Sequence, residues 1–276
     1  MITRHAAYQP QFLTALPESS RIRASESNFL VRAVAFFSQR NFVYSLPRKL
    51  AAEFIGTFTI IFIAVGSVCA DQYLGAASQT RLGWLGIAAA YGLAYAAMVV
   101  ALGHVSGGHF NPAVTIGFWV VKRLSTFQTI AYSIVQLTAA SGAAYLIKII
   151  LPDTTWRPVV LGAPVLAQDF TRLHAMALEA SLTFFVVFVV FAAAGDGLDG
   201  APHRVAGLAV GLTIAMGSLL GGPFTGAAMN PARAFGPALA APHWQNQGVY
   251  WVGTLFGGII AAFVYERLFP IDQRLP

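Results

Sequence analysis

The tripeptide Asn-Pro-Ala occurs twice in this chain, and its asparagines are well placed to donate hydrogen bonds. Asn is a favoured N-cap and Pro a favoured first helical residue, so each copy predicts a helix entered from a loop of small residues. A capping Asn uses its side-chain oxygen on its own helix, which leaves the amide NH2 to donate outward. The motifs therefore predict two donors beside the positive ends of two helices. Their residues are Asn111, Pro112, Ala113, Asn230, Pro231 and Ala232.

The helices that follow these motifs are short and lie in a strongly apolar chain. Hydrophobic residues make up 57% of the 276 residues and charged residues only 10%, whereas a soluble domain usually has about 25% charged residues. This composition indicates a polytopic membrane protein. Each motif precedes only about ten helix-compatible residues, a length of roughly 15 Å that crosses half of a bilayer core. Because backbone that ends inside a membrane needs polar partners, we expect these short helices to line something.

The apolar segments predict an all-α membrane protein with six transmembrane helices and two re-entrant half-helices. The half-helices end near residues 121 and 241, and the spans are expected at about 50–70, 82–102, 127–150, 174–194, 205–220 and 249–268. Each full span is near the roughly 20 residues that a bilayer requires. Three spans, with a half-helix after the second, are followed by the same order again. The second half therefore enters the membrane from the opposite side, as an inverted repeat.

These boundaries divide the chain into two tails and one membrane domain. Residues 1–46 form the first tail, 47–268 the membrane domain and 269–276 the second tail. Repeat one covers 47–151 and repeat two 172–268, with a polar, proline-containing connection between them. The Arg- and Ser-rich first tail, which has few acidic residues, is consistent with a cytoplasmic tail or with an organelle transit peptide.

The distribution of basic residues predicts the orientation in the membrane. The net charge is +6, but the bases are not clustered on one soluble face, which argues against a nucleic-acid partner. Twelve of the 17 Lys and Arg fall on the same side of the predicted membrane as the N-terminus. This excess predicts that both termini are cytoplasmic. The single Cys69 excludes an intrachain disulfide and a metal site built from several cysteines.

Ionisable residues inside the predicted membrane domain are the remaining candidates. Glu53 and Glu179 lie at corresponding places in the two repeats. Intramembrane carboxylates are typical of proton-coupled carriers, although their symmetric placement favours a structural role. Arg233 follows the second motif directly, and a charge at that depth is expected to be functional. His104 and His109 lack a third ligand nearby, so we predict no metal and no cofactor. No nucleophile–base pair is evident, so we do not expect an enzyme.

The segments around both motifs resemble the signature loops of the aquaporins, in the major intrinsic protein family. The matching segments are 103–115 (GHVSGGHFNPAVT), 226–237 (GAAMNPARAFGP) and, in the first span, 51–57 (AAEFIGT). The likeness covers about residues 46–268 and implies an aquaporin-like channel domain in the cell membrane, with one pore per subunit of a homotetramer. Such a pore passes water without protons or ions. A proton-coupled carrier that uses the two glutamates, and a junction protein with a closed pore, remain alternatives.

The resemblance also implies roles for single residues. The two motif asparagines would meet at the centre of the pore. The four positions of the selectivity filter would be Tyr91, Ser218, Ala227 and Arg233. The residues that would support the re-entrant loops are Glu53, Glu179 and His104.

Two sets of positions predict different solutes. Ser218 stands where strict water channels usually have His, and Ala227 is also small. This pair predicts a wider pore that also passes ammonia, hydrogen peroxide, undissociated metalloid acids or glycerol. In contrast, Ala234 stands where glycerol facilitators typically have Asp, and the aromatic pair Tyr250-Trp251 resembles that of water channels. We therefore expect water as the main substrate and leave the range of other neutral solutes open.

Overall fold

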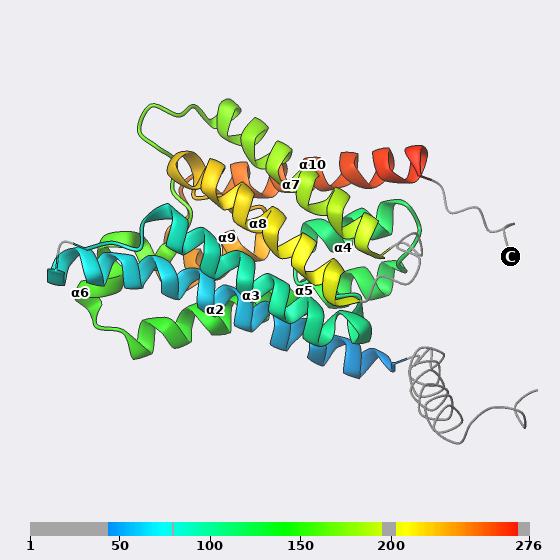
Figure 1. The fold of residues 1–276 in the computed structure, drawn as a ribbon, viewed down its shortest axis with the longest axis horizontal. Helices are drawn as coiled ribbons and strands as arrows, with labels where there is room; N and C mark the ends of the chain where they lie inside the picture. Colours follow the sequence, from blue (N-terminus) through cyan, green and yellow to red (C-terminus); the bar gives the residue numbers. More distant parts are fainter. Residues whose placement is uncertain (1–43, 79, 195–202, 270–276) are drawn as a thin grey trace, which may run out of the picture. The chain divides into compact units, whose positions relative to one another are not determined.

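The computed structural model describes residues 44–78, 80–194 and 203–269 of the chain, which form helices joined by short connections (Figure 1). In chain order these are α2 (Leu46–Ser78), α3 (Gly83–Ser106), α4 (Pro112–Val120), α5 (Thr126–Ile150), α6 (Asp153–Trp156), the 3-10 helix η2 (Arg157–Gly162), α7 (Arg172–Ala194), α8 (His203–Thr225), α9 (Pro231–Ala240) and α10 (Gln247–Leu268). Nearly all of the predicted tails lies outside the described residues.

Six helices in the described part of the chain are long and apolar enough to cross a membrane: α2, α3, α5, α7, α8 and α10. Large hydrophobic side chains are exposed on all six, among them Leu93 at 66% and Ile149 at 78%. Water disfavours large apolar surfaces of this kind, whereas lipid tails accept them. The predicted all-α fold with six spans is therefore confirmed.

Helix α2 is longer than the predicted span at 50–70. It continues to Ser78 although the apolar run ends at Asp71. The Asp71 carboxylate accepts a hydrogen bond from the Gly83 backbone N–H at 2.8 Å and pairs with Arg81 at 3.0 Å. These bonds tie the last turns of α2 to the start of α3. The polar residue therefore marks the end of the apolar segment and not the end of the helix.

The polar, proline-containing connection between the two repeats is partly helical. Its residues form α6 and η2, and η2 packs against α2. Trp156 and Leu161 are buried, at 5% and 0% exposed. Val160 and Leu161 have left-handed backbone conformations, with φ of 49° and 54°. Prolines prevent a long helix here, but the apolar side chains between them still find a place in the core.

The two repeats interlock, so that each half-helix packs against the other repeat. Helix α2 packs on α3 and α5, and its counterpart α7 packs on α8 and α10. Half-helix α4 of repeat one lies against α10, and α9 of repeat two lies against α5. The repeats also meet along α3 and α8 (Figure 1). A Cβ atom on Gly92 would lie 2.5 Å from the Gly211 carbonyl oxygen, so only glycine permits this approach.

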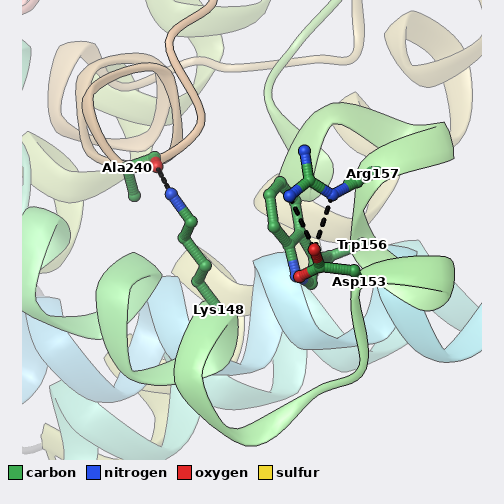
Figure 2. Close-up of polar contacts among 5 residues, drawn as sticks. All are labelled: Lys148, Asp153, Trp156, Arg157 and Ala240. Atoms are coloured by element: carbon green, nitrogen blue, oxygen red, sulfur yellow. Dashed lines mark hydrogen bonds and ion pairs between the residues drawn. The ribbon is translucent and has the colours of Figure 1, made fainter.

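The C-terminal end of half-helix α9 is held by a side chain from α5. The last carbonyl groups of a helix lack partners within it and carry a partial negative charge. Lys148 Nζ donates to the Ala240 carbonyl oxygen at 2.6 Å (Figure 2) and lies 5.1 Å from the centroid of the Trp156 ring. Asp153 accepts a hydrogen bond from the Trp156 indole at 3.1 Å and pairs with Arg157 at 2.6 Å. Lys148 therefore anchors the far end of the half-helix.

Lys148→Met is expected to lower the free energy of unfolding by about 1–2 kcal/mol, because it removes a charge-assisted hydrogen bond at a helix C-terminus. Thermal unfolding in detergent, followed by tryptophan fluorescence, measures the change. Lys148→Arg keeps a cation and a donor and serves as the matched control. A Lys148→Met protein as stable as the unmodified chain would show that packing alone holds α9.

Candidate functional site

The two Asn-Pro-Ala motifs cap the half-helices in the same way. Asn111 Oδ1 accepts a hydrogen bond from the Ala113 backbone N–H at 2.8 Å, and Asn230 Oδ1 accepts one from Ala232 at 2.9 Å. The proline of each motif occupies the first helical position. The half-helices have 9 and 10 residues, which corresponds to about 15 Å. Local capping preferences therefore place both asparagines at buried helix starts.

The asparagine amides reach across to the opposite loop. Asn111 Nδ2 donates to the Met229 carbonyl oxygen at 2.8 Å, and Asn230 Nδ2 donates to the Phe110 carbonyl oxygen at 2.9 Å. Phe110 and Met229 directly precede the asparagines and have φ values of 48° and 52°. That left-handed conformation is strained for residues other than glycine. The amides predicted to donate freely outward therefore each use one N–H to join the two repeats.

A buried carboxylate holds the first loop in this strained conformation. Glu53 accepts the backbone N–H groups of His109 at 3.0 Å and Phe110 at 2.7 Å. It also accepts the Ser106 hydroxyl at 2.6 Å and the Gln136 amide at 2.8 Å. Because Glu53 is 0% exposed, these four bonds replace the solvation that its carboxylate loses on burial.

The second loop has the equivalent arrangement. Glu179 accepts the backbone N–H groups of Ala228 at 2.9 Å and Met229 at 2.8 Å, and the Thr225 hydroxyl at 2.7 Å. It is also 0% exposed. In both repeats the carboxylate thus binds the two backbone groups just before an asparagine, and both of its oxygens are engaged. This geometry supports a structural role for Glu53 and Glu179 over that of a proton-coupled carrier.

The histidines of the first loop differ from the prediction. The sequence predicts that His104 supports the loop, but His104 is exposed near the end of α3, and its ring packs edge-on against Tyr44 with 6.0 Å between centroids. His109 is instead buried. Its Nδ1 lies 3.1 Å from the Thr115 hydroxyl, and its ring stacks on Phe118 at 4.7 Å. Of the two histidines, His109 is therefore the one that contacts the first half-helix, α4.

All four predicted filter positions are buried. Tyr91 and Ser218 are each 3% exposed, Ala227 is 1% and Arg233 is 5%. The Tyr91 hydroxyl donates to the Ala228 carbonyl oxygen at 3.3 Å, so this side chain from α3 reaches the second loop. Arg233 lies in the first turn of α9, which follows the second loop directly. Three of the four positions are thereby linked around the second loop, while Ser218 lies on α8.

Two of these positions carry buried polar atoms without a protein partner. Within the described ranges, Nε and Nη1 of Arg233 and Oγ of Ser218 form no hydrogen bond. A buried donor without a partner is costly, and an ionisable group at membrane depth usually marks a pathway for a polar species. These atoms are therefore available to a water molecule or another small polar solute.

Buried tyrosines in the last span of each repeat also fasten the loops, a role that the sequence does not predict for them. The Tyr132 hydroxyl donates to the Ser106 carbonyl oxygen at 2.9 Å, and the Tyr250 hydroxyl donates to the Thr225 carbonyl oxygen at 2.9 Å. They lie at matching places, on α5 and α10. That repetition in the sequence is the signal that identifies them.

Comparison with known proteins decides the family, because residues 42–265 match the Major intrinsic protein family. The chain belongs to this family. It is therefore a multi-pass membrane channel and not an enzyme, as the sequence predicts.

Relatives named as aquaporins are similar to this chain over most of its length. It is 41% identical over 227 residues to probable aquaporin TIP3-2 of Arabidopsis thaliana, covering 80% of this chain and 83% of that protein. It is 33% identical over 228 residues to aquaporin-4 of Mus musculus, covering 83% and 69%. The X-ray structure of the aquaglyceroporin from Plasmodium falciparum matches with a TM-score of 0.71 at 20% identity, covering 82% of this chain and 98% of that chain. This structural likeness supports the fold alone.

Proposed function

We propose that this channel conducts water along a path between the two repeats. The observation that carries the proposal is the buried Arg233, whose Nε and Nη1 have no partner in the described part of the chain, together with the unpartnered Oγ of Ser218. Water supplies both a donor and an acceptor, and it satisfies such atoms without a covalent change. The relatives named as aquaporins support the same substrate.

The proposed path explains how protons and ions are excluded. A water molecule accepts a hydrogen bond from Arg233, passes apolar walls and reaches the motif asparagines, each of which begins a half-helix at its positive end. The general account of aquaporin-type pores assigns selectivity to pore diameter, lining donors and acceptors, and a barrier from an Arg or from half-helix dipoles. A hydronium ion would have to lose hydration beside these positive groups, so the barrier opposes it.

The solute range is proposed from the filter. Ser218 and Ala227 leave room for small neutral solutes, such as ammonia, hydrogen peroxide, metalloid acids or glycerol. Stopped-flow scattering of proteoliposomes in gradients of water, glycerol, ammonia and hydrogen peroxide tests this range. A pore predicts flux without saturation, whereas a carrier that uses Glu53 or Glu179 predicts saturable flux driven by a pH gradient. Proteoliposomes no more permeable to water than empty liposomes would contradict the proposal.

Ser218→His is expected to reduce the permeability to glycerol several-fold and the permeability to water much less. The larger imidazole fills space that the small serine leaves and adds a donor to the filter. Stopped-flow measurement of both solutes in the same proteoliposome preparation gives the ratio. Thr213→Ser is the matched control, because it changes another hydroxyl residue of α8, whose Oγ1 donates within the helix to the Ala209 carbonyl oxygen at 2.8 Å. The control is expected to keep the ratio, and an unchanged ratio in Ser218→His would show that this position does not set the solute size.

The remaining proposals concern the assembly and its membrane. By family resemblance we propose a homotetramer in the cell membrane, with both termini cytoplasmic. Light scattering of the purified protein after subtraction of detergent tests the tetramer. Labelling of a cysteine placed beside either terminus of a Cys69→Ala chain, in sealed cells and in broken cells, tests the orientation.

A further inference from the structure

Two tyrosines on α3 bond to the same carbonyl position in the two re-entrant loops. The Tyr95 hydroxyl donates to the His109 carbonyl oxygen at 2.5 Å, and the Tyr91 hydroxyl donates to the Ala228 carbonyl oxygen at 3.3 Å. His109 and Ala228 each stand two residues before a motif asparagine. One helix therefore serves equivalent acceptors of both repeats, through side chains one turn apart whose ring centroids lie 6.5 Å apart.

These acceptors lie where the two repeats meet. The next carbonyl along each loop, that of Phe110 or Met229, receives the asparagine amide of the opposite repeat. At membrane depth, a loop carbonyl needs a partner from the protein or from water in a path. The two hydroxyls therefore occupy positions at which a permeating water molecule would otherwise bind.

Other side chains besides the tyrosine pair also hold the loops in shape. Loop support is duplicated in both repeats, by Glu53 and Glu179 and by the tyrosines of α5 and α10. The tyrosine pair on α3 has no counterpart in the second repeat. Gly92 of α3 and Gly211 of α8 are equivalent positions in the two repeats. Tyr91 and Tyr95 therefore correspond to Val210 and Ile214 on α8. The hydroxyls of this pair therefore serve both loops from α3 alone, which leaves a role in the path for the tyrosines.

We propose that Tyr95 forms a second constriction in the water path, beside the filter residue Tyr91, that hinders solutes larger than water. The proposal rests on the proposed water path. Tyr95 is 0% exposed, and its ring is held edge-on against Tyr91 and Phe110, the latter at 6.1 Å between centroids. A water molecule can take the place of the tyrosine hydroxyl on the carbonyl acceptor with little displacement of the ring. A larger solute has to move a ring that is packed on both sides.

Two substitutions separate the effect of ring size from that of the hydroxyl. Tyr95→Leu shortens the side chain and is expected to raise the permeability ratio of glycerol to water several-fold. Tyr95→Phe removes only the hydroxyl, frees the His109 carbonyl and is expected to raise water permeability without a comparable rise for glycerol. Tyr132→Phe is the matched control, since it removes the same kind of hydroxyl-to-loop bond at the start of the loop and is expected to lower thermal stability while the solute ratio stays constant.

Stopped-flow measurements on proteoliposomes with matched protein content distinguish the outcomes. If the unmodified chain conducts water and Tyr95→Leu leaves the glycerol-to-water ratio unchanged, the constriction is wrong and the water path stands. If only Tyr95→Leu conducts water, the tyrosine pair closes the path and the proposal holds in a stronger form. If neither conducts water, both proposals are wrong.

Discussion

Glu179→Ala is expected to abolish water conduction and to destabilise the protein severely. The substitution leaves the backbone N–H groups of Ala228 and Met229 without their acceptor, and it leaves the Thr225 hydroxyl only its 3.3 Å bond to the Gly221 carbonyl oxygen. Each buried donor that loses its partner costs about 1–3 kcal/mol, so the total is expected to exceed about 3 kcal/mol. Met229 also loses the bond that holds its left-handed backbone, so its carbonyl no longer meets the Asn111 amide.

Thermal unfolding in detergent and stopped-flow water flux in proteoliposomes measure the two effects of Glu179→Ala. The matched control is Glu266→Ala, because Glu266 pairs with Arg123 at 2.8 Å and its side chain is 37% exposed. Exposed ion pairs contribute at most about 1 kcal/mol, so the control should conduct water normally. Normal stability and flux in Glu179→Ala would show that the other loop bonds suffice without the carboxylate.

Arg233→Val is expected to raise proton leakage by up to about a thousandfold while water still passes. A unit charge about 4 Å from a permeating cation contributes roughly 4 kcal/mol of repulsion at the effective dielectric constant of a protein. The valine removes this repulsion. The positive ends of α4 and α9 remain and keep part of the barrier, so the loss of selectivity is large but incomplete.

Proton leakage through Arg233→Val is followed with a pH-sensitive dye inside proteoliposomes under a pH gradient, and water flux is measured on the same preparation. Arg172→Val provides the control, because Arg172 is exposed and donates to the Asn246 side chain at 2.9 Å. That variant should leak no more protons than the unmodified chain. If Arg233→Val leaks no more protons than the unmodified chain, the half-helix ends alone exclude protons.

The half-helices and spans were predictable because they depend on local physics. An N-cap asparagine followed by proline sets a helix start within two residues, as the bonds from Ala113 and Ala232 show. The bilayer sets the length of the spans. Where local polarity was taken as a boundary, the prediction failed. Asp71 did not end α2, because its carboxylate is bonded to residues at the start of α3.

The repeat made part of the site predictable as well. The symmetric placement of Glu53 and Glu179 favours loop support over proton transport, and each carboxylate accepts two backbone N–H groups of its loop. The two histidines of the first loop have no such symmetry. His104 and His109 have the same chemistry, so only the observed end of α3, which leaves His104 exposed and His109 buried, distinguishes them.

The sequence by itself determined the family, the inverted repeat and the helix starts at the two asparagines, because capping and hydrophobic length act between neighbouring residues. Only the tertiary structure decided where the amides of those asparagines point. Their partners lie 118 and 120 residues away in the chain. The same holds for Tyr91 and Tyr95, whose hydroxyls reach both loops from one helix. These contacts depend on how closely the repeats approach along α3 and α8, and that distance follows from packing at Gly92 and Gly211 across the whole fold.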